Sequence, residues 1–166
     1  DMLRRAVLEL TGPVAVRYPR GGEGAYRAPW SGQAADRIRT GADVTLLAYG
    51  TMIAEAERAA RRLEAEEGIA AEVVKLNRIA PLPLDLVLES VGKTGRMVVA
   101  EDCFAVGCVG QQVSAALAQA GIQAKIRLLN LGQRFVQQGT VPQLQRSLGL
   151  DAQGIYEAAC EVCHGN

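Results

Sequence analysis

The sequence predicts an α/β protein, built as a three-layer sandwich with helices on both faces of a largely parallel sheet. Short runs rich in valine, leucine and isoleucine alternate along the chain with longer amphipathic segments. This alternation is typical of βαβ units with right-handed crossovers. The short runs are apolar almost without interruption, as expected of strands that are buried on both faces of a parallel sheet.

The strands are predicted at the short apolar runs. These are residues 13–18, 43–49, 71–76, 96–100 and 125–129. One further segment, residues 36–39, is followed by a tight turn into the run at 43–49. Its charged residues suit an antiparallel strand at the edge of the sheet.

Helices are predicted between the strands, from apolar residues that recur at helical spacing. They cover residues 53–67, 84–91, 111–120 and 142–148, followed by a last helix that starts after Asp151 and runs through Cys160. Asp151 is a typical N-cap residue. Gly68 stands where a helix C-cap is expected.

The chain divides into four parts. Residues 21–32 are rich in glycine and show little periodicity, which is typical of a linker. Residues 1–20 are too few for a domain, so they form either a decorating arm or the last strand of a neighbouring domain. The α/β domain itself is expected over residues 33–159, followed by a flexible tail at 160–166.

Composition excludes several classes of function. Eighteen basic residues balance eighteen acidic ones, so no overall positive field points to nucleic acid or to an acidic membrane surface. No apolar run approaches the ~20 residues that span a bilayer. The first residues do not form a secretory signal, so we expect a cytoplasmic location and reduced thiols.

The four cysteines and the single histidine are candidates for cofactor or metal binding. Cys160, Cys163 and His164 form a C-x-x-C-H pattern, which is used for covalent haem attachment. A zinc site is the second possibility, with Cys103 and Cys108 as the other ligands, although their spacing fits no common zinc finger. The third, which we favour, is a frayed tail with incidental thiols.

Three further groups of residues are candidate binding sites. The turn at residues 107–110 follows a strand and opens a helix, so it is either a phosphate cradle or simply a tight turn. Glu101 and Asp102 follow a buried strand, at the sheet edge where α/β proteins place functional groups. They are candidates for metal binding or for acid–base chemistry, and the alternative is a pair that forms an interface or anchors a loop. Arg17 and Arg20 flank a rigid turn, and arginine side chains match phosphate or carboxylate oxygens; the alternative is an ordinary pair of surface residues.

The sequence resembles the 1-deoxy-D-xylulose-5-phosphate synthases, in order from about Gly12 to Ile155. The first matching stretch looks like the end of their central, pyrimidine-binding domain, and the rest resembles their C-terminal domain. The most specific parts are an Arg-Tyr-Pro-Arg-Gly turn at 17–21 and a Leu-Gly-Leu-Asp sequence at 148–151. The remaining stretches lie at 12–16, 41–51, 81–85, 98–101, 130–140 and 152–155.

The resemblance implies a transketolase C-terminal-like fold with a five-stranded mixed sheet and one antiparallel edge strand. It implies that the chain is a fragment, preceded by N-terminal domains that are missing here. The full-length enzyme would be a homodimer that condenses pyruvate with glyceraldehyde 3-phosphate and releases CO₂, for isoprenoid and thiamine biosynthesis. Thiamine diphosphate and Mg²⁺ would bind between the first two domains, so the resemblance implies no catalytic, cofactor-binding or metal-binding residue in this fragment.

One functional residue carries over from the resemblance. Arg20 matches the position that helps to bind the phosphate of the acceptor substrate, whereas Arg17 and Tyr18 are expected to be structural. The domain would also support dimerisation and close part of the substrate entrance, and the isolated fragment is expected to be inactive. The alternatives are the C-terminal domain of a transketolase or of a 2-oxoacid dehydrogenase β subunit, and a stand-alone binding domain.

Overall fold

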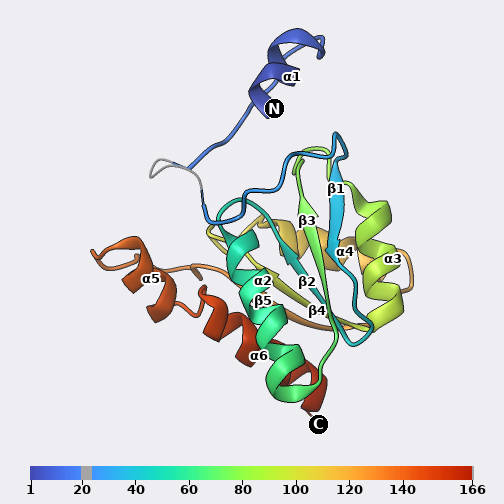
Figure 1. The fold of residues 1–166 in the computed structure, drawn as a ribbon, viewed down its shortest axis with the longest axis vertical. Helices are drawn as coiled ribbons and strands as arrows, with labels where there is room; N and C mark the ends of the chain where they lie inside the picture. The colour runs from blue at the N-terminus through green and yellow to red at the C-terminus, as the bar shows by residue number, and fades with distance from the viewer. Residues whose placement is uncertain (20–23, 166) are drawn as a thin grey trace.

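The protein is an α/β/α sandwich, and Figure 1 shows the sheet between two layers of helices. The computed structural model describes residues 1–19 and 24–165. One sheet has the strand order β1-β3-β2-β4-β5, with β1 antiparallel to β3 and the other pairs parallel. The predicted fold class is therefore confirmed. The strands are β1 (Ala35–Arg39), β2 (Val44–Ala48), β3 (Ala71–Leu76), β4 (Arg96–Ala100) and β5 (Lys125–Leu129).

The helices follow the predicted pattern, with one addition at the N-terminus. They are α1 (Met2–Leu8), α2 (Met52–Arg62), α3 (Leu84–Thr94), α4 (Val109–Gln119), α5 (Val141–Ser147) and α6 (Ala152–His164). A π-helical turn, Leu63–Glu67, extends α2 up to Gly68, whose φ of 68° is the left-handed conformation expected of a C-cap glycine. Asp151 caps α6, because its Oδ1 accepts the Gly154 N–H at 3.0 Å.

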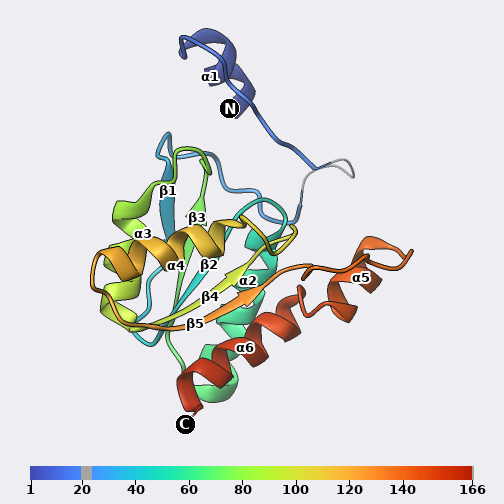
Figure 2. The same ribbon diagram turned by 180° about the vertical axis from the view of Figure 1, so that it is seen from behind.

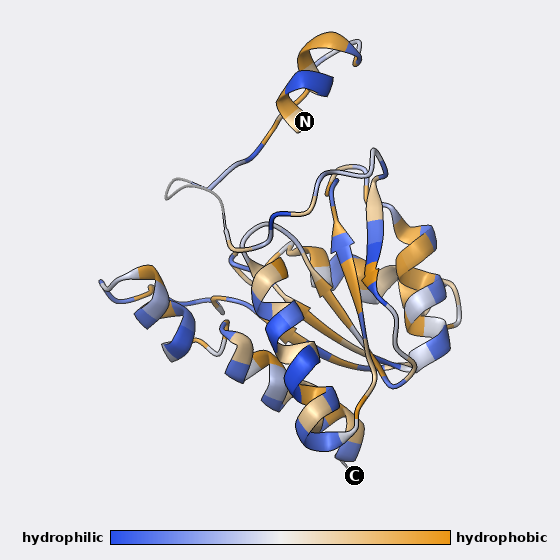
Figure 3. Ribbon diagram, in the orientation of Figure 1, coloured by the Kyte–Doolittle hydropathy of each residue, from blue (hydrophilic) through white to orange (hydrophobic). Residues whose placement is uncertain are grey.

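Two apolar cores lie on the two faces of the sheet. One joins the sheet to α2 and α6, through side chains such as Leu46, Leu63 and Ile155. The other joins it to α3 and α4, through side chains such as Val91 and Val113. Figures 1 and 2 show these two helix pairs on opposite sides, and Figure 3 shows the central strands mostly in the hydrophobic colour.

The outer strand β5 differs from the prediction of a fully buried run. Every residue of β2 and β3 is buried, whereas β5 has only exposed or half-buried residues. The reason is its place at the edge of the sheet, where Lys125 and Arg127 extend to solvent on an otherwise apolar strand.

The edge strand β1 is antiparallel as predicted, but its partner is β3 rather than the strand that follows it. The connection from β1 to β2 lies against the residues just before β3. The N–H groups of Ala42 and Asp43 both donate to the Ala70 carbonyl. Gly41 permits this crossing, because a Cβ at that position would lie 2.3 Å from the Ala71 carbonyl carbon.

The N-terminal segment is not part of the sheet. Residues 13–18, expected as the last strand of a preceding domain, belong to no helix or strand here, and α1 precedes them. A strand needs a neighbour for its backbone hydrogen bonds, so the assignment of residues 1–20 to a preceding domain stays a prediction. Arg5 connects α1 to the following segment, because it donates to the Gly32 carbonyl at 2.8 Å and lies over the Trp30 ring.

The C-terminal segment also differs from the prediction. The last helix continues through His164 instead of giving way to a tail at Cys160. Val162 is buried, and Cys160 and Cys163 pack against the core shared with α2. This apolar face explains why the helix extends to the last turn.

Polar groups are buried at the amino edge of the sheet. The Thr45 hydroxyl is hydrogen-bonded to the hydroxyls of Ser90 at 2.8 Å and Thr94 at 2.9 Å. Glu72, which is fully buried, pairs with Lys93 and lies 3.1 Å from Arg37 Nε. Burial alone would raise the pKa of Glu72, but Lys93, Ser90 and Arg37 outweigh it and lower that pKa.

Candidate functional site

The carboxyl edge of the sheet carries the candidate site, and Glu101 lies at its centre. Glu101 directly follows β4 and its side chain is fully buried. Its two carboxylate oxygens each accept a backbone N–H at 2.8 Å, from Val109 and from Gly110. The Tyr49 hydroxyl, at the end of β2, donates to the same carboxylate at 3.1 Å. A buried carboxylate with three donors is a fixed structural anchor.

The turn at residues 107–110 is therefore not a phosphate cradle. The N–H groups of Val109 and Gly110 at the start of α4 would be the donors for an anion, but Glu101 already accepts both. A Cβ at Gly110 would lie 2.6 Å from Leu128 Cδ2 and 2.8 Å from Glu101 Oε1, so no space remains between these groups. The tight-turn alternative is the one that the structure supports.

This geometry also tests whether the chain fits a thiamine diphosphate and magnesium site. The helix start that could cradle a diphosphate is occupied by Glu101. Among residues 1–19 and 24–165, no group of three or more His, Cys, Asp or Glu side chains could hold a metal ion. The site around Glu101 therefore does not fit this cofactor, and we derive no catalytic step through it.

The acid pair predicted from sequence is divided between two environments. Glu101 is buried, whereas Asp102 is exposed. Next to them, Cys103 Sγ lies 3.7 Å from Glu101 Oε2 and 3.9 Å from the Tyr49 hydroxyl. Burial and the Glu101 carboxylate raise the pKa of the Cys103 thiol to about 11, and the same two causes raise the pKa of Tyr49. The Cys103 thiol and the Tyr49 hydroxyl are therefore neutral at pH 7, and their contacts with Glu101 hold the loop after β4 in place.

Two loops at this edge are joined to each other. One follows β4 and the other follows β5. The Ala105 N–H donates to the Gly132 carbonyl at 3.1 Å, and the Leu131 N–H donates to the Cys103 carbonyl at 3.0 Å. We call the pair, residues 103–106 and 131–136, the paired loops. Their exposed large apolar side chains are Phe104, Val106, Phe135 and Val136.

The two pairs of cysteines lie at opposite edges of the sheet. Cys103 and Cys108 follow the carboxyl end of β4. Cys160 and Cys163 lie on the last turns of α6, near residues at the amino ends of the strands, since Arg96 and Asp43 act on the Cys163 thiol. A strand of this length spans ~16 Å, so a zinc site built from both pairs is excluded. His164 Nε2 lies 3.8 Å from Glu67 Oε2, which gives it a structural partner.

The N-terminal candidates lie partly outside the described residues. Arg20, the predicted phosphate-binding residue, is one of the residues at 20–23 that the structure does not describe. Arg17 and Tyr18 are exposed and belong to no helix or strand. The structure thus brings neither of them together with Glu101 and the paired loops.

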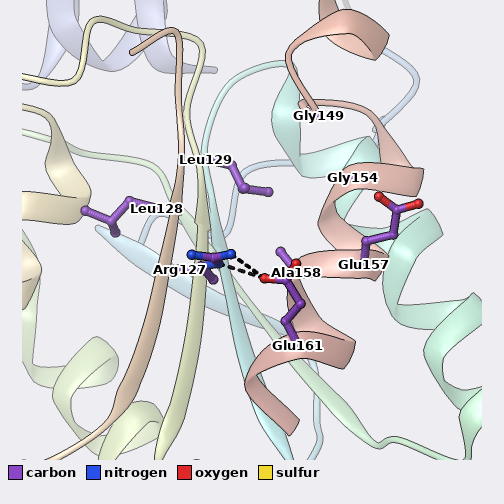
Figure 4. A pocket seen from close by; sticks show the side chains of 8 residues that line it. All are labelled: Arg127, Leu128, Leu129, Gly149, Gly154, Glu157, Ala158 and Glu161. Atoms are coloured by element: carbon purple, nitrogen blue, oxygen red, sulfur yellow. Dashed lines mark hydrogen bonds and ion pairs between the residues drawn. The ribbon is translucent and has the colours of Figure 1, made fainter. Parts of the chain in front are cut away.

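A pocket of about 240 Å³ lies between β5 and α6 (Figure 4). Arg127 reaches across it to Glu161, with its Nε 2.9 Å from Glu161 Oε2. The positive charge of Arg127 is thereby paired with the Glu161 carboxylate. The other lining residues are Leu128, Leu129, Gly149, Gly154, Glu157 and Ala158.

Tyr49 and the loop residue Phe135 are members of the site that sequence reasoning missed. Tyr49 directly follows a predicted strand, so the rule that singles out Glu101 at the end of a strand would have identified it as well. Phe135 carries no such signal, because an exposed aromatic residue in a loop cannot be told from a buried one by its sequence position.

No helix within the described part of the chain is long and apolar enough to cross a membrane.

Comparisons with solved structures support the fold. A structure titled "Split gene transketolase, inactive beta4 tetramer" matches 78% of this chain and 42% of its own, with a TM-score of 0.68 and 33% identity. A transketolase mutant from Pichia stipitis matches 79% of this chain with a TM-score of 0.56 and 18% identity, which shows a similar fold.

Comparisons of sequence give the family. Residues 33–155 match the model of the transketolase C-terminal domain. The 1-deoxy-D-xylulose-5-phosphate synthases of Heliobacterium modesticaldum and Thermomicrobium roseum are each 36% identical, over 97% and 93% of this chain. The chain spans about a quarter of the length of these relatives, 25% in both cases. The chain therefore belongs to the transketolase C-terminal domain family, as a C-terminal domain of the 1-deoxy-D-xylulose-5-phosphate synthase type.

Proposed function

We propose that this chain is the C-terminal domain of a full-length 1-deoxy-D-xylulose-5-phosphate synthase. That enzyme would condense pyruvate with glyceraldehyde 3-phosphate and release CO₂, with thiamine diphosphate and Mg²⁺ bound by the domains that precede this one. The observation that carries the proposal is the similarity of nearly the whole chain to one quarter of several such synthases. The enzyme would act in the cytoplasm as a homodimer, to which this domain contributes.

The role of this domain is supportive. Its candidate site uses Glu101 to hold a helix start and a loop, and this site does not fit the cofactor. We therefore propose that the 166-residue chain alone is inactive. Within it, Arg20 would contact the phosphate of the acceptor, since a guanidinium group can bind phosphate oxygens with two hydrogen bonds.

The test is to express the complete gene beside the 166-residue chain. Both proteins would be supplied with pyruvate, glyceraldehyde 3-phosphate, thiamine diphosphate and Mg²⁺, and CO₂ release would be measured. We expect release by the longer protein and none by the short chain. Failure of the longer protein to release CO₂ would reject the synthase function, and activity of the short chain would reject the supportive role.

The Arg20 proposal needs its own variants in the full-length enzyme. Loss of a charged hydrogen bond to phosphate costs ~1.5–3 kcal/mol, so Arg20→Ala should raise the KM of glyceraldehyde 3-phosphate roughly tenfold or more. The KM of pyruvate should stay unchanged. Arg17→Ala is the matched control and should leave both values near those of the parent. An equal effect of both variants on both substrates would indicate a structural role for this turn.

A transketolase is the second candidate, because the split-gene transketolase structure is 33% identical to this chain. A transketolase transfers carbon from a ketose and releases no CO₂, so the same assay separates the two. If the full-length enzyme consumed xylulose 5-phosphate and left pyruvate untouched, the transketolase would replace the synthase as the proposed function.

A further inference from the structure

We propose that the paired loops, residues 103–106 and 131–136, are the docking surface for the part of the full-length synthase that precedes this domain. The docking proposal rests on the proposed function. It adds to that function by assigning the contact between domains to named side chains. Three observations carry it: the apolar side chains on these loops, the bonds that hold the loops together, and the edge at which the chain enters the domain.

The first observation is the exposure of large apolar side chains. Phe135 is fully exposed, at 104% of its reference area, and Phe104 is 52% exposed. Val106 is 61% exposed and Val136 is 36% exposed. Single exposed apolar residues are ordinary, but four large ones on two joined loops are the kind of surface that proteins cover with a partner.

The second observation is the set of hydrogen bonds at the base of the paired loops. The loops are held to each other by the hydrogen bonds from Ala105 to Gly132 and from Leu131 to Cys103. Beneath the first loop, the fully buried Glu101 carboxylate holds the start of α4. Loops whose bases are already held lose less conformational entropy on contact than free loops do, which favours binding.

The third observation identifies the occupant. β1 is antiparallel, with Ala35 opposite Leu76, so it begins at the carboxyl edge of the sheet. Gly24 also lies at this edge, since a Cβ there would be 4.0 Å from the Cα of Thr51, which follows β2. The chain therefore reaches the domain on the side that carries the paired loops. In relatives about four times as long as this chain, the preceding part is thereby brought to that edge.

Oxidative labelling of the two phenylalanines tests the docking directly. Hydroxyl radicals would be applied to the 166-residue chain and to the full-length protein, and oxidation of Phe104 and Phe135 would be measured by mass spectrometry of peptides. Labelling follows exposed side-chain area, so we expect it to fall about fivefold or more in the full-length protein. Tyr156 on α6 is the internal control and should change little. Equal labelling of the phenylalanines in both proteins would overturn the proposal.

Two further measurements distinguish failure of the docking proposal from failure of the proposed function. If labelling of the short chain itself falls as its concentration rises, the occupant is a second copy of this domain, and the proposal is wrong. CO₂ release by the full-length protein is measured independently, so protected loops in an enzyme without synthase activity would reject the proposed function and leave the docking intact.

A substitution at Phe135 tests whether the docking contact stabilises the full-length protein. Phe135→Ser should leave the melting temperature of the 166-residue chain unchanged, because the side chain has no contact to lose there. In the full-length protein it should lower the melting temperature. An unchanged melting temperature in both proteins would contradict the docking, whatever the activity of the variant.

Discussion

The Glu101 carboxylate accepts the backbone N–H of Gly110 at 2.8 Å, and this bond ties the end of β4 to the start of α4. A helix start with free N–H groups ordinarily attracts an anion from outside. Here the anion is the side chain of Glu101, the residue that directly follows the preceding strand. The arrangement fixes the intervening loop, residues 102–108, and with it one half of the paired loops.

Replacing the anchor with its neutral counterpart should destabilise the domain. Glu101→Gln keeps the shape of the side chain but removes its charge. One carboxylate oxygen becomes an NH₂ group, which cannot accept the N–H of Val109 or Gly110. Hydrogen bonds to charged groups contribute ~1.5–3 kcal/mol. We expect a loss of about this size in the free energy of unfolding, measured by urea denaturation. Asp102→Asn is the control, since Asp102 is exposed; similar losses for both variants would contradict the anchor.

Adding one methyl group at position 110 should be costly, because the site has no room. In Gly110→Ala the new Cβ would lie 2.6 Å from Leu128 Cδ2 and 2.8 Å from Glu101 Oε1. Overpacking of this kind costs roughly 1–3 kcal/mol. Gly92→Ala is the matched control in the interior of α3, where the nearest atom is 3.8 Å away. It should stabilise the protein by about 0.5–1 kcal/mol, and the two variants should thus shift the urea midpoint in opposite directions.

The sheet was predictable from sequence where burial dominates. The apolar runs at 71–76 and 96–100 match the buried strands β3 and β4 residue for residue. Such runs have few ways to hide their side chains from water, so local composition decides the structure. The helix caps at Gly68 and Asp151 were likewise predictable, because each depends on one residue and its own backbone.

The features that sequence missed depend on distant partners. The partner of β1 is set by the close crossing at Gly41, where the chain passes the Ala71 backbone. Glu101 was identified as a candidate, yet its role as an anchor follows from two N–H groups eight and nine residues further on. These relationships arise only when the chain is folded.

Stability should fall in acid partly because of Glu72. The folded protein lowers the pKa of this carboxyl, since Lys93, Ser90 and Arg37 outweigh its burial. A group with a lowered pKa stabilises the fold above its unfolded value near 4.5 and loses this contribution as the pH falls below that value. Glu72→Gln should therefore reduce the difference in unfolding free energy between neutral and acidic solution. An unchanged difference would mean that Glu72 gains nothing from its partners.

The Cys103 thiol should be unreactive at ordinary pH. Burial and the nearby Glu101 carboxylate raise its pKa to about 11, and only the thiolate attacks an alkylating reagent. At pH 8 the thiolate fraction is then about 100-fold or more below that of a free thiol whose pKa is near 8.5. Alkylation by iodoacetamide, followed by mass spectrometry of the peptide that contains Cys103, should be slower than that of glutathione by a similar factor. The rate should rise about tenfold for each pH unit up to pH 10, because the thiolate fraction grows in that proportion below the pKa. A rate that levels off near pH 9 would show that the Tyr49–Glu101–Cys103 contacts are not kept in solution.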